Sequence, residues 1–408
     1  MPADAAARVP RSVPFFLASR FLGGTALTLL RAALAWHVFD LSGSPFQLGL
    51  VGLVQFAPVL AFSLPGGALA DVGDRRRIAL AAITVPFCVG LGLCALARTG
   101  GATLPLLYVA AFAIAAASAF ESPARAALLP DLVPRDVFAR VVPFATTAMA
   151  LGFVTGPAVA GLVIGEAGIA AAYATYAGLM AASAAALLPV RALRAPEPSG
   201  RGVSLGAIRE GLSFVRARPV VLGCMLLDML AVIFGGATAL LPVYAKDILA
   251  VGPRGYGVLF ASFEVGSLAM GLLLLTRPPV RHAGRVLLAA VAVYGVATVV
   301  FGLSRSFPLS FAAYAAAGMA DQVSVVMRHT TVQLATPDVL RGRVSAVNSI
   351  FIGASNQLGA VESGFVAAAT SAPFAVVTGG LACLVVVAVV ARRIPELARY
   401  RVDRAAQA

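Results

Sequence analysis

The sequence predicts an all-α integral membrane protein with twelve transmembrane helices, arranged as two pseudo-symmetric six-helix bundles. The first observation is composition: 60% of the residues are hydrophobic, 12% are charged, and the mean hydropathy is +0.92. Soluble domains carry about 25% charged residues. The second is the length of the apolar runs, which matches the roughly 20 residues that a helix needs to cross a bilayer. A membrane β-barrel would show alternating segments of about ten residues instead. The third is an internal repeat, described below.

Twelve apolar runs define the predicted spans. Short loops separate them, so the chain has no room for a sizeable soluble domain. The runs cover 14–39, 46–70, 78–97, 103–122, 141–164, 169–190, 219–243, 256–276, 286–303, 308–327, 344–368 and 373–391.

The repeat divides the chain at a linker, 191–218, that is rich in Arg, Gly and Pro. We therefore expect one bundle over 1–190, a second over 219–392, and a tail over 393–408. The pairs that recur at a spacing of 203 residues are Arg125 and Arg328, Pro134 and Pro337, Arg140 and Arg343, Gly156 and Gly359, and Gly161 and Gly364. Two parallel repeats joined by a linker are typical of secondary transporters.

The distribution of basic residues predicts the orientation. If the N-terminus is cytoplasmic, 25 of the 31 basic residues, Arg125 and Arg328 among them, fall in cytoplasmic segments and four fall on the other side. This bias is the positive-inside signal, and it predicts an inner-membrane protein with both termini in the cytoplasm. It also accounts for the net charge of +13. Since no basic run is interleaved with aromatic residues for base stacking, we expect no nucleic-acid partner.

The stretch from Gly66 to Arg77, GGALADVGDRRR, lies between the second and third runs. It resembles the signature loop between helices 2 and 3 of the major facilitator superfamily. The matching positions are Gly67, Asp71, Arg75 and Arg76. Val72 and Asp74 stand where the motif usually has Arg and Gly. The resemblance implies that Asp71 latches the outward-open state near the cytoplasmic start of helix 11. The alternative is a plain cytoplasmic loop whose arginines set the topology.

The fifth run carries small residues at helical spacing and a proline. They are Gly152, Gly156, Pro157, Ala160 and Gly161. Such spacing lets another helix approach closely. The pattern resembles the antiporter motif of the superfamily's exporters, which implies a gating role against the second half and transport in the export direction. The alternative is ordinary helix packing.

Two further segments, 120–134 and 341–364, resemble the enterobactin-exporter-like, drug-efflux branch of the superfamily. They lie in different halves of the chain and make the family assignment specific. The substrate does not carry over, because siderophore, drug and metabolite exporters share these segments.

Charged residues inside the spans are the candidate substrate and proton sites, because each costs about 2.5 to 3.5 kcal/mol at a helix centre and therefore faces the bundle interior. The first run contributes Arg20 and Arg31, which share one helical face. The second half contributes Asp228, Glu264, Asp321 and Glu362, together with Asn348 on the face of Glu362. Four acids against two arginines leave two carboxylates to hold protons or await a cation. We expect Glu264 to carry the proton; the alternative is that these charges form fixed interhelical pairs.

The predicted function is secondary active transport: a proton-coupled exporter, or antiporter, of a small amphipathic organic molecule, working by rocking of the two halves. The sequence lacks a phosphate loop, a nucleophile elbow and a zinc-protease motif, so we expect neither an enzyme nor a cofactor. The four cysteines fall inside apolar runs, which predicts no disulfide and no metal site. His37 is expected at the membrane interface, and a monomer is expected. The alternatives are a proton-linked uptake symporter and a transport-inactive sensor or scaffold.

Overall fold

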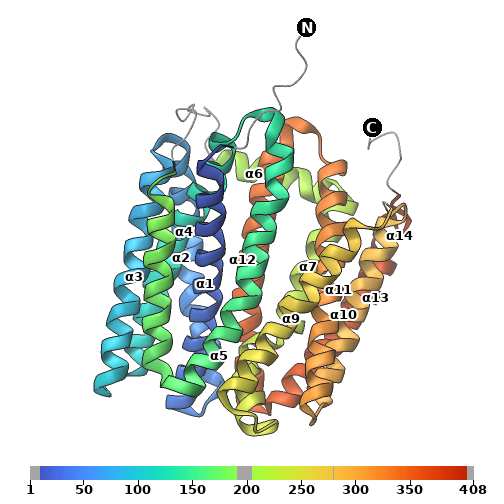
Figure 1. Cartoon of the computed structure of the whole chain (residues 1–408). Coiled ribbons are helices and arrows are strands. Elements are labelled where there is room, and N and C mark those ends of the chain that lie inside the picture. Colours follow the sequence, from blue (N-terminus) through green and yellow to red (C-terminus); the bar gives the residue numbers. More distant parts are fainter. Residues whose placement is uncertain (1–9, 191–204, 279, 402–408) are drawn as a thin grey trace. The chain divides into compact units, whose positions relative to one another are not determined.

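The computed structural model describes residues 10–190, 205–278 and 280–401 (Figure 1). Most of the predicted linker and the end of the predicted tail lie outside these ranges. The regular elements of the described residues are all helical. They are α1 (Ser12–Ser42), α2 (Pro45–Val72), α3 (Arg75–Thr99), α4 (Leu104–Leu132), α5 (Arg135–Leu187), α6 (Leu205–Ala217), α7 (Pro219–Gly235), η1 (Ala237–Leu240), α8 (Leu241–Val243), η2 (Tyr244–Ile248), α9 (Gly252–Leu275), α10 (Ala283–Leu303), α11 (Phe307–Ala335), α12 (Asp338–Ala369), α13 (Ala372–Arg393) and α14 (Pro395–Arg399).

The helices account for the twelve predicted crossings. Ten helical segments of the described chain are long and apolar enough to span a membrane. One of them, α5, runs for 53 residues and contains a left-handed break at Gly168, with φ 80° and ψ 176°. Glycine adopts this conformation without a steric penalty, so α5 supplies two crossings. The twelfth is α12, whose 32 residues are long enough to cross a membrane but less apolar than the other ten segments. The predicted all-helical, twelve-span fold is confirmed.

The described residues form two compact units, which we consider separately. Unit 1 holds 10–37 and 57–190. Its helices approach closely where the facing residues are glycines. A Cβ on Gly90 of α3 would lie 2.7 Å from the ring of Tyr176, and one on Gly152 of α5 would lie 2.6 Å from the carbonyl oxygen of Phe21 in α1. Small residues therefore set the helix spacing in this unit.

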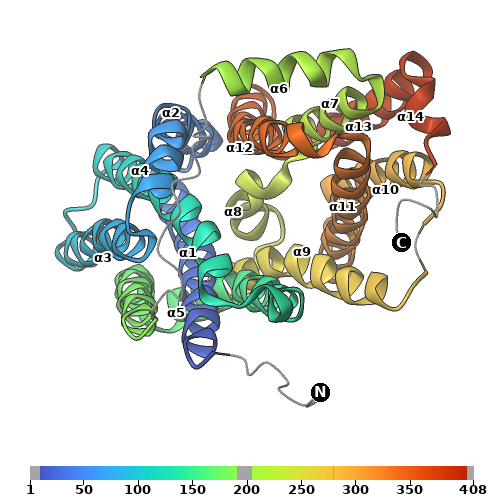
Figure 2. The same cartoon turned by 90° about the horizontal axis from the view of Figure 1, so that it is seen from above.

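Unit 2 holds 38–56, 205–278 and 280–401. Seen from above, its main helices follow one another in the order α9, α11, α10, α13, α7 and α12 (Figure 2). The amphipathic helix α6 lies along α12, where Glu210 pairs with Arg343. This helix lies within the predicted linker, 191–218.

The segment 38–56 joins the end of α1 to the start of α2, and it packs within unit 2 although the sequence assigned it to the first bundle. A Cβ on Gly364 of α12 would lie 2.6 Å from the backbone of Gly49. Phe46 stacks on Phe365 at a centroid distance of 4.8 Å. Hence α12 contacts the start of α2, within this segment.

The predicted span 219–243 is not one continuous helix. The α-helix α7 ends at Gly235, and Gly236 has φ −73° and ψ 80°. Side chains bind the carbonyl groups that the break frees: the Tyr294 hydroxyl donates to the oxygen of Gly235, and the Ser363 hydroxyl donates to that of Gly236, each at 2.9 Å. Non-helical backbone at membrane depth is stable only when such partners exist.

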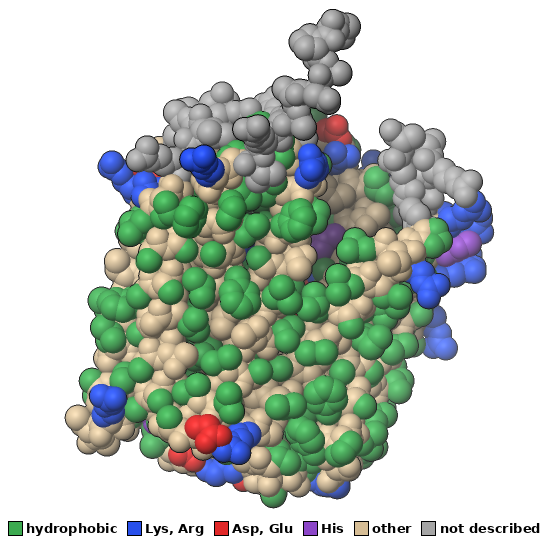
Figure 3. All heavy atoms as spheres, viewed as in Figure 1, with side chains coloured by type: hydrophobic (Ala, Val, Ile, Leu, Met, Phe, Trp, Pro, Cys, Tyr) green, Lys and Arg blue, Asp and Glu red, His purple; other side chains and the backbone are tan. Residues whose placement is uncertain are grey.

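The surface agrees with a membrane environment. On the face shown in Figure 3, charged side chains gather toward the two ends of the helices, and apolar side chains cover the region between them. Large hydrophobic side chains exposed on the helices of unit 1 include Leu60 of α2, Val109 of α4 and Leu162 of α5. In water such a surface would favour association, whereas lipid tails solvate it.

Candidate transport site

The central feature of unit 2 is a buried ion pair between α7 and α11. Arg328 Nη1 lies 2.5 Å from Asp228 Oδ2, and the two side chains are 5% and 9% exposed. The sequence analysis placed Arg328 in a cytoplasmic loop, because it follows the apolar run directly. That placement was wrong: α11 continues to Ala335, and Asp228 has the interhelical partner that the alternative interpretation had anticipated.

Two more predicted acids lie near this pair. Asp321, on α11, is in electrostatic range of Asp228, Arg328 and Glu264. Asp321 therefore interacts with both members of the ion pair and with Glu264. Tyr314 is also in range of Glu264 and Asp321. Its hydroxyl lies 2.7 Å from the Thr238 hydroxyl, beside the break after α7. We call Asp228, Glu264, Asp321 and Arg328 the acidic network.

The predicted polar face of α12 is largely internal. Asn348 is 8% exposed, and its side-chain oxygen is buried without a hydrogen-bond partner. Ser355 is fully buried and donates to the Ile352 carbonyl within α12. Glu362 is half-buried, and the Ser363 hydroxyl lies 3.4 Å from its Oε2. This face thus carries polar groups from the start of α12 to the break after α7.

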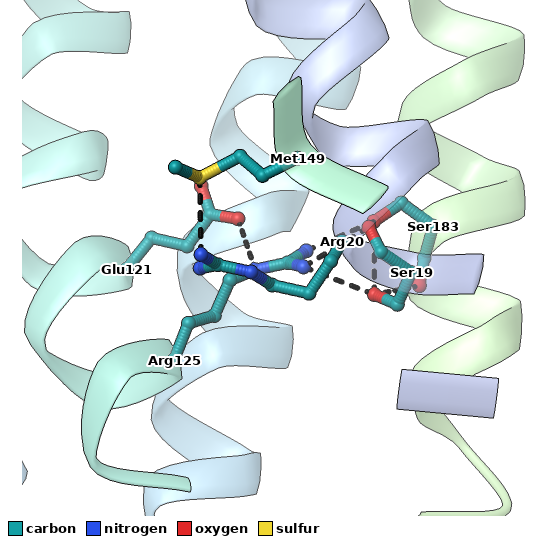
Figure 4. Close-up of polar contacts among 6 residues, drawn as sticks. All are labelled: Ser19, Arg20, Glu121, Arg125, Met149 and Ser183. Carbon is teal, nitrogen blue, oxygen red and sulfur yellow. Dashed lines mark hydrogen bonds and ion pairs between the residues drawn. The ribbon is translucent and has the colours of Figure 1, made fainter. Parts of the chain in front are cut away.

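Unit 1 has a buried arginine of its own, Arg125 on α4 (Figure 4). Its Nη1 lies 3.0 Å from the Ser19 hydroxyl, its Nη2 lies 2.9 Å from the Ser183 hydroxyl, and its Nε lies 2.6 Å from Glu121 Oε1. The sequence analysis counted Arg125 among the loop arginines, and this placement was also wrong. The repeat that pairs Arg125 with Arg328 was the signal: each half buries one arginine, but their carboxylate partners differ.

The two arginines of α1 have different surroundings. Arg20 is partly buried, and its Nη2 donates to the sulfur of Met149 at 3.0 Å. Its Nε is buried without a hydrogen-bond partner. Arg31, which the sequence put on the same face, is exposed on unit 1. Whether either binds substrate stays a prediction.

The residues of the signature loop organise the end of unit 1 where α2 meets α3. Arg75 Nη1 lies 2.5 Å from Asp131 Oδ2, beside the end of α4. Arg76 donates to the carbonyl oxygens of Leu187 and Leu188 at the end of α5, where the helix dipole favours a cation. These contacts give both arginines a structural role in addition to their effect on topology.

The structure also places Asp74 and Val72, which depart from the motif, and Asp71, the acid that matches it. Asp74 caps α3, since its Oδ1 accepts hydrogen bonds from the backbone of Arg76 and Arg77 at 3.0 and 3.1 Å. Val72 is exposed at the end of α2, and Asp71 is partly exposed beside it. The latch role of Asp71 stays a prediction.

The predicted gating glycines differ in whether the structure leaves room for a side chain at their positions. A Cβ on Gly67 would meet no atom within 4 Å, whereas one on the preceding Gly66 would overlap the carbonyl of Ala119 in α4. On α5, a Cβ on Gly156 would overlap Thr28 of α1. Pro157 and Gly161 are buried beside it. These contacts give the α5 motif a packing partner within unit 1, and its gating role stays a prediction.

His37 is 6% exposed, and its Nδ1 lies 2.9 Å from the hydroxyl of Tyr173. Its place at the membrane interface stays a prediction. Within the described ranges, His, Cys, Asp and Glu form no group of three able to hold a metal ion, and the four cysteines are free thiols.

Comparison with known proteins identifies the family. Residues 16–406 match the family model described as transmembrane secretion effector. The chain is 27% identical over 392 residues to the enterobactin exporter EntS of Escherichia coli, Shigella boydii and Escherichia fergusonii, covering 95% of this chain and 92% of each relative.

Solved structures share the fold. A bacterial homologue of the human lysosomal transporter Spinster has 16% identity and a TM-score of 0.72, with 96% of this chain and 97% of that chain covered. A POT family transporter in complex with 5-aminolevulinic acid has 12% identity and a TM-score of 0.74, with 95% and 97% covered. The chain is therefore a membrane transporter of the major facilitator type and belongs to the transmembrane secretion effector family.

Proposed function

We propose that this protein is a proton-coupled exporter of a small organic molecule. The observation that carries the proposal is the acidic network of unit 2. Asp321 is in electrostatic range of Asp228, Arg328 and Glu264, so an added proton relieves the repulsion between ionised acids and a lost proton restores it. Protonation thus changes the energy of the bundle interior.

Within the network we assign the exchangeable proton to Glu264 and Asp321. Asp228 is in direct contact with Arg328, at 2.5 Å. Asp321 is in electrostatic range of both Asp228 and Glu264. Loading a proton on either of the remaining acids relieves the same repulsion, which makes the two a coupled pair.

The export direction is supported by the exporter relatives, which are similar over nearly the whole chain. The antiporter-like motif around Gly156 points the same way. We further propose that the segment 38–56 forms part of the outer gate. It is held to unit 2 by the Gly49–Gly364 contact and by the ion pair between Asp40 and Lys246 at 2.6 Å. Opening the outside then requires α12 to release this segment.

The test uses inside-out vesicles with an imposed pH gradient and a pH-sensitive dye, with a panel of organic substrates. In inside-out vesicles the cytoplasmic face of the protein is on the outside. Substrate added there should make the wild-type protein move protons out of the vesicle lumen. Glu264→Gln should abolish substrate-dependent proton flux while leaving substrate binding. Glu166→Gln is the matched control, because Glu166 is exposed and lies outside the network.

Three outcomes would count against the proposal. Flux that persists in Glu264→Gln removes that residue as the proton carrier. Substrate accumulation in intact cells, above that of control cells, would favour proton-linked uptake over export. The absence of any substrate-dependent flux across the whole panel would favour a transport-inactive sensor.

A further inference from the structure

The cluster around Arg20 in unit 1 carries more positive than negative charge. Of the six residues drawn in Figure 4, two are cationic and one is anionic. Arg20 and Arg125 lie in electrostatic range of one another and of Glu121. Because charges inside a membrane protein are costly unless they are compensated, this excess needs an explanation.

The carboxylate of Glu121 is committed to Arg125. The two are 2.6 Å apart, one helical turn from each other on α4. Ser19 and Ser183 accept from the remaining nitrogens of Arg125, at 3.0 and 2.9 Å. The guanidinium of Arg125 is therefore surrounded by oxygen partners, and the cluster's second cation, Arg20, has no equivalent set.

The partners of Arg20 are poor for a guanidinium. Its Nη2 donates to the thioether of Met149 at 3.0 Å, and a thioether is a weak acceptor. Its Nε is buried without a hydrogen-bond partner. The Nε and Nη2 groups of arginine together form the edge that binds a carboxylate through two parallel hydrogen bonds. In Arg20 one position on this edge is held by sulfur and the other is unused.

The Met149 side chain is flexible enough to move away from Arg20 when a ligand binds. A methionine side chain is unbranched and adapts its shape readily. Arg20 is itself partly exposed. The neighbouring Gly23 has no side chain, and a Cβ there would lie 3.5 Å from both terminal nitrogens of Arg125, an ordinary van der Waals distance.

We propose that Arg20, supported by the charge of Arg125, binds a carboxylate group of the transported molecule, and that the Met149 thioether holds its place when the site is empty. This inference rests on the proposed function and narrows it to organic anions or zwitterions. The carboxylate replaces a weak acceptor by a charged one and neutralises the excess cation.

The test measures binding of sodium benzoate to the full-length protein in phosphatidylcholine nanodiscs, by titration calorimetry and by the shift in unfolding temperature. Benzyl alcohol, a neutral molecule of similar shape, is the ligand control. Benzoate should stabilise the protein and benzyl alcohol should not. Arg20→Gln should weaken benzoate binding by about tenfold or more, as expected for a lost hydrogen bond to a charged group. Arg98→Gln, at the exposed end of α3, should bind as the wild type does.

Two other variants should raise the affinity for benzoate. A purely structural role for the cluster would not produce such an increase. Met149→Leu keeps the side-chain volume and removes the sulfur acceptor, so benzoate should bind severalfold more tightly. Glu121→Gln removes the only carboxylate of the cluster and should also tighten binding. Should Glu121→Gln fail to fold because Arg125 loses its ion pair, Met149→Leu still decides the sign.

The proposal is overturned if benzoate behaves like benzyl alcohol, if Arg20→Gln binds benzoate as well as the wild type, or if Met149→Leu binds it more weakly. An anionic lipid offers a similar oxyanion, so the measurement is repeated with phosphatidylglycerol nanodiscs. Stabilisation that appears only with this lipid also overturns it. Because the assay is at equilibrium, benzoate binding without proton flux would contradict the proposed function alone, and flux without benzoate binding would contradict this inference alone.

Discussion

Asp228 and Arg328 form a buried ion pair that joins α7 to α11, with 2.5 Å between Oδ2 and Nη1. The partners are 100 residues apart in the chain. Removing one charge of such a pair leaves the other buried and uncompensated.

The first prediction concerns this pair. Asp228→Asn should lower the free energy of unfolding by about 3 to 5 kcal/mol, because Arg328 then has no ionised partner in direct contact. The double variant Asp228→Leu, Arg328→Met should recover much of the loss. Thermal unfolding in detergent measures both, and Asp338→Asn, which breaks the exposed pair with Arg341, is the control. A double variant less stable than Asp228→Asn would contradict the prediction.

The second prediction separates the two glycines that open the signature loop. Gly66→Ala should reduce the yield of folded protein and cost about 1 to 3 kcal/mol through overpacking, because its Cβ would overlap the carbonyl of Ala119. Gly67→Ala should not lower stability, since its Cβ would meet open space and alanine is favoured over glycine inside a helix. Size-exclusion profiles and unfolding temperatures give the comparison. Equal effects from both substitutions would refute it.

The third prediction addresses the unusual acid of the loop. Asp74→Ala should cost about 1 kcal/mol, because two backbone N–H groups at the start of α3 lose their acceptor. Asp74→Gly restores the usual motif residue and should cost only a few tenths of a kcal/mol, since glycine is tolerated at a helix N-cap. The unfolding temperatures of the two variants should differ accordingly. If alanine is as well tolerated as glycine, the cap contributes little.

The fourth prediction concerns the pair between Asp40 and Lys246. Both side chains are largely exposed, at 53% and 41%, so Lys246→Gln should change the free energy of unfolding by less than about 1 kcal/mol. If the segment 38–56 is part of the outer gate, the same variant should nevertheless change the transport rate. The stability and flux measurements are made on one preparation. A large loss of stability, or an unchanged rate, would argue against the gate.

Much of the fold could be predicted because the relevant signals are local. Long apolar runs, the gap between the runs 141–164 and 169–190, and the repeat of Arg125 at Arg328 can each be read along the chain. The site residues were harder to predict, because a span predicted from hydropathy alone ends at the first charged residue. Arg125 and Arg328 were therefore placed in loops, and Asp228 was counted without its partner. The repeat contained the correction, since equivalent arginines in two halves suggest equivalent surroundings.

By itself, the sequence determined that the chain is a helical transporter of the major facilitator type, since hydropathy and motif positions do not depend on which side chains meet. Only the tertiary structure decided which charges are compensated. It paired Asp228 with Arg328 across two helices, and in unit 1 it gave Glu121 to Arg125 and left Arg20 with a thioether. The physical reason is that burying a charge has a cost that depends on its neighbours within a few ångströms, and those neighbours come from helices far apart in the chain.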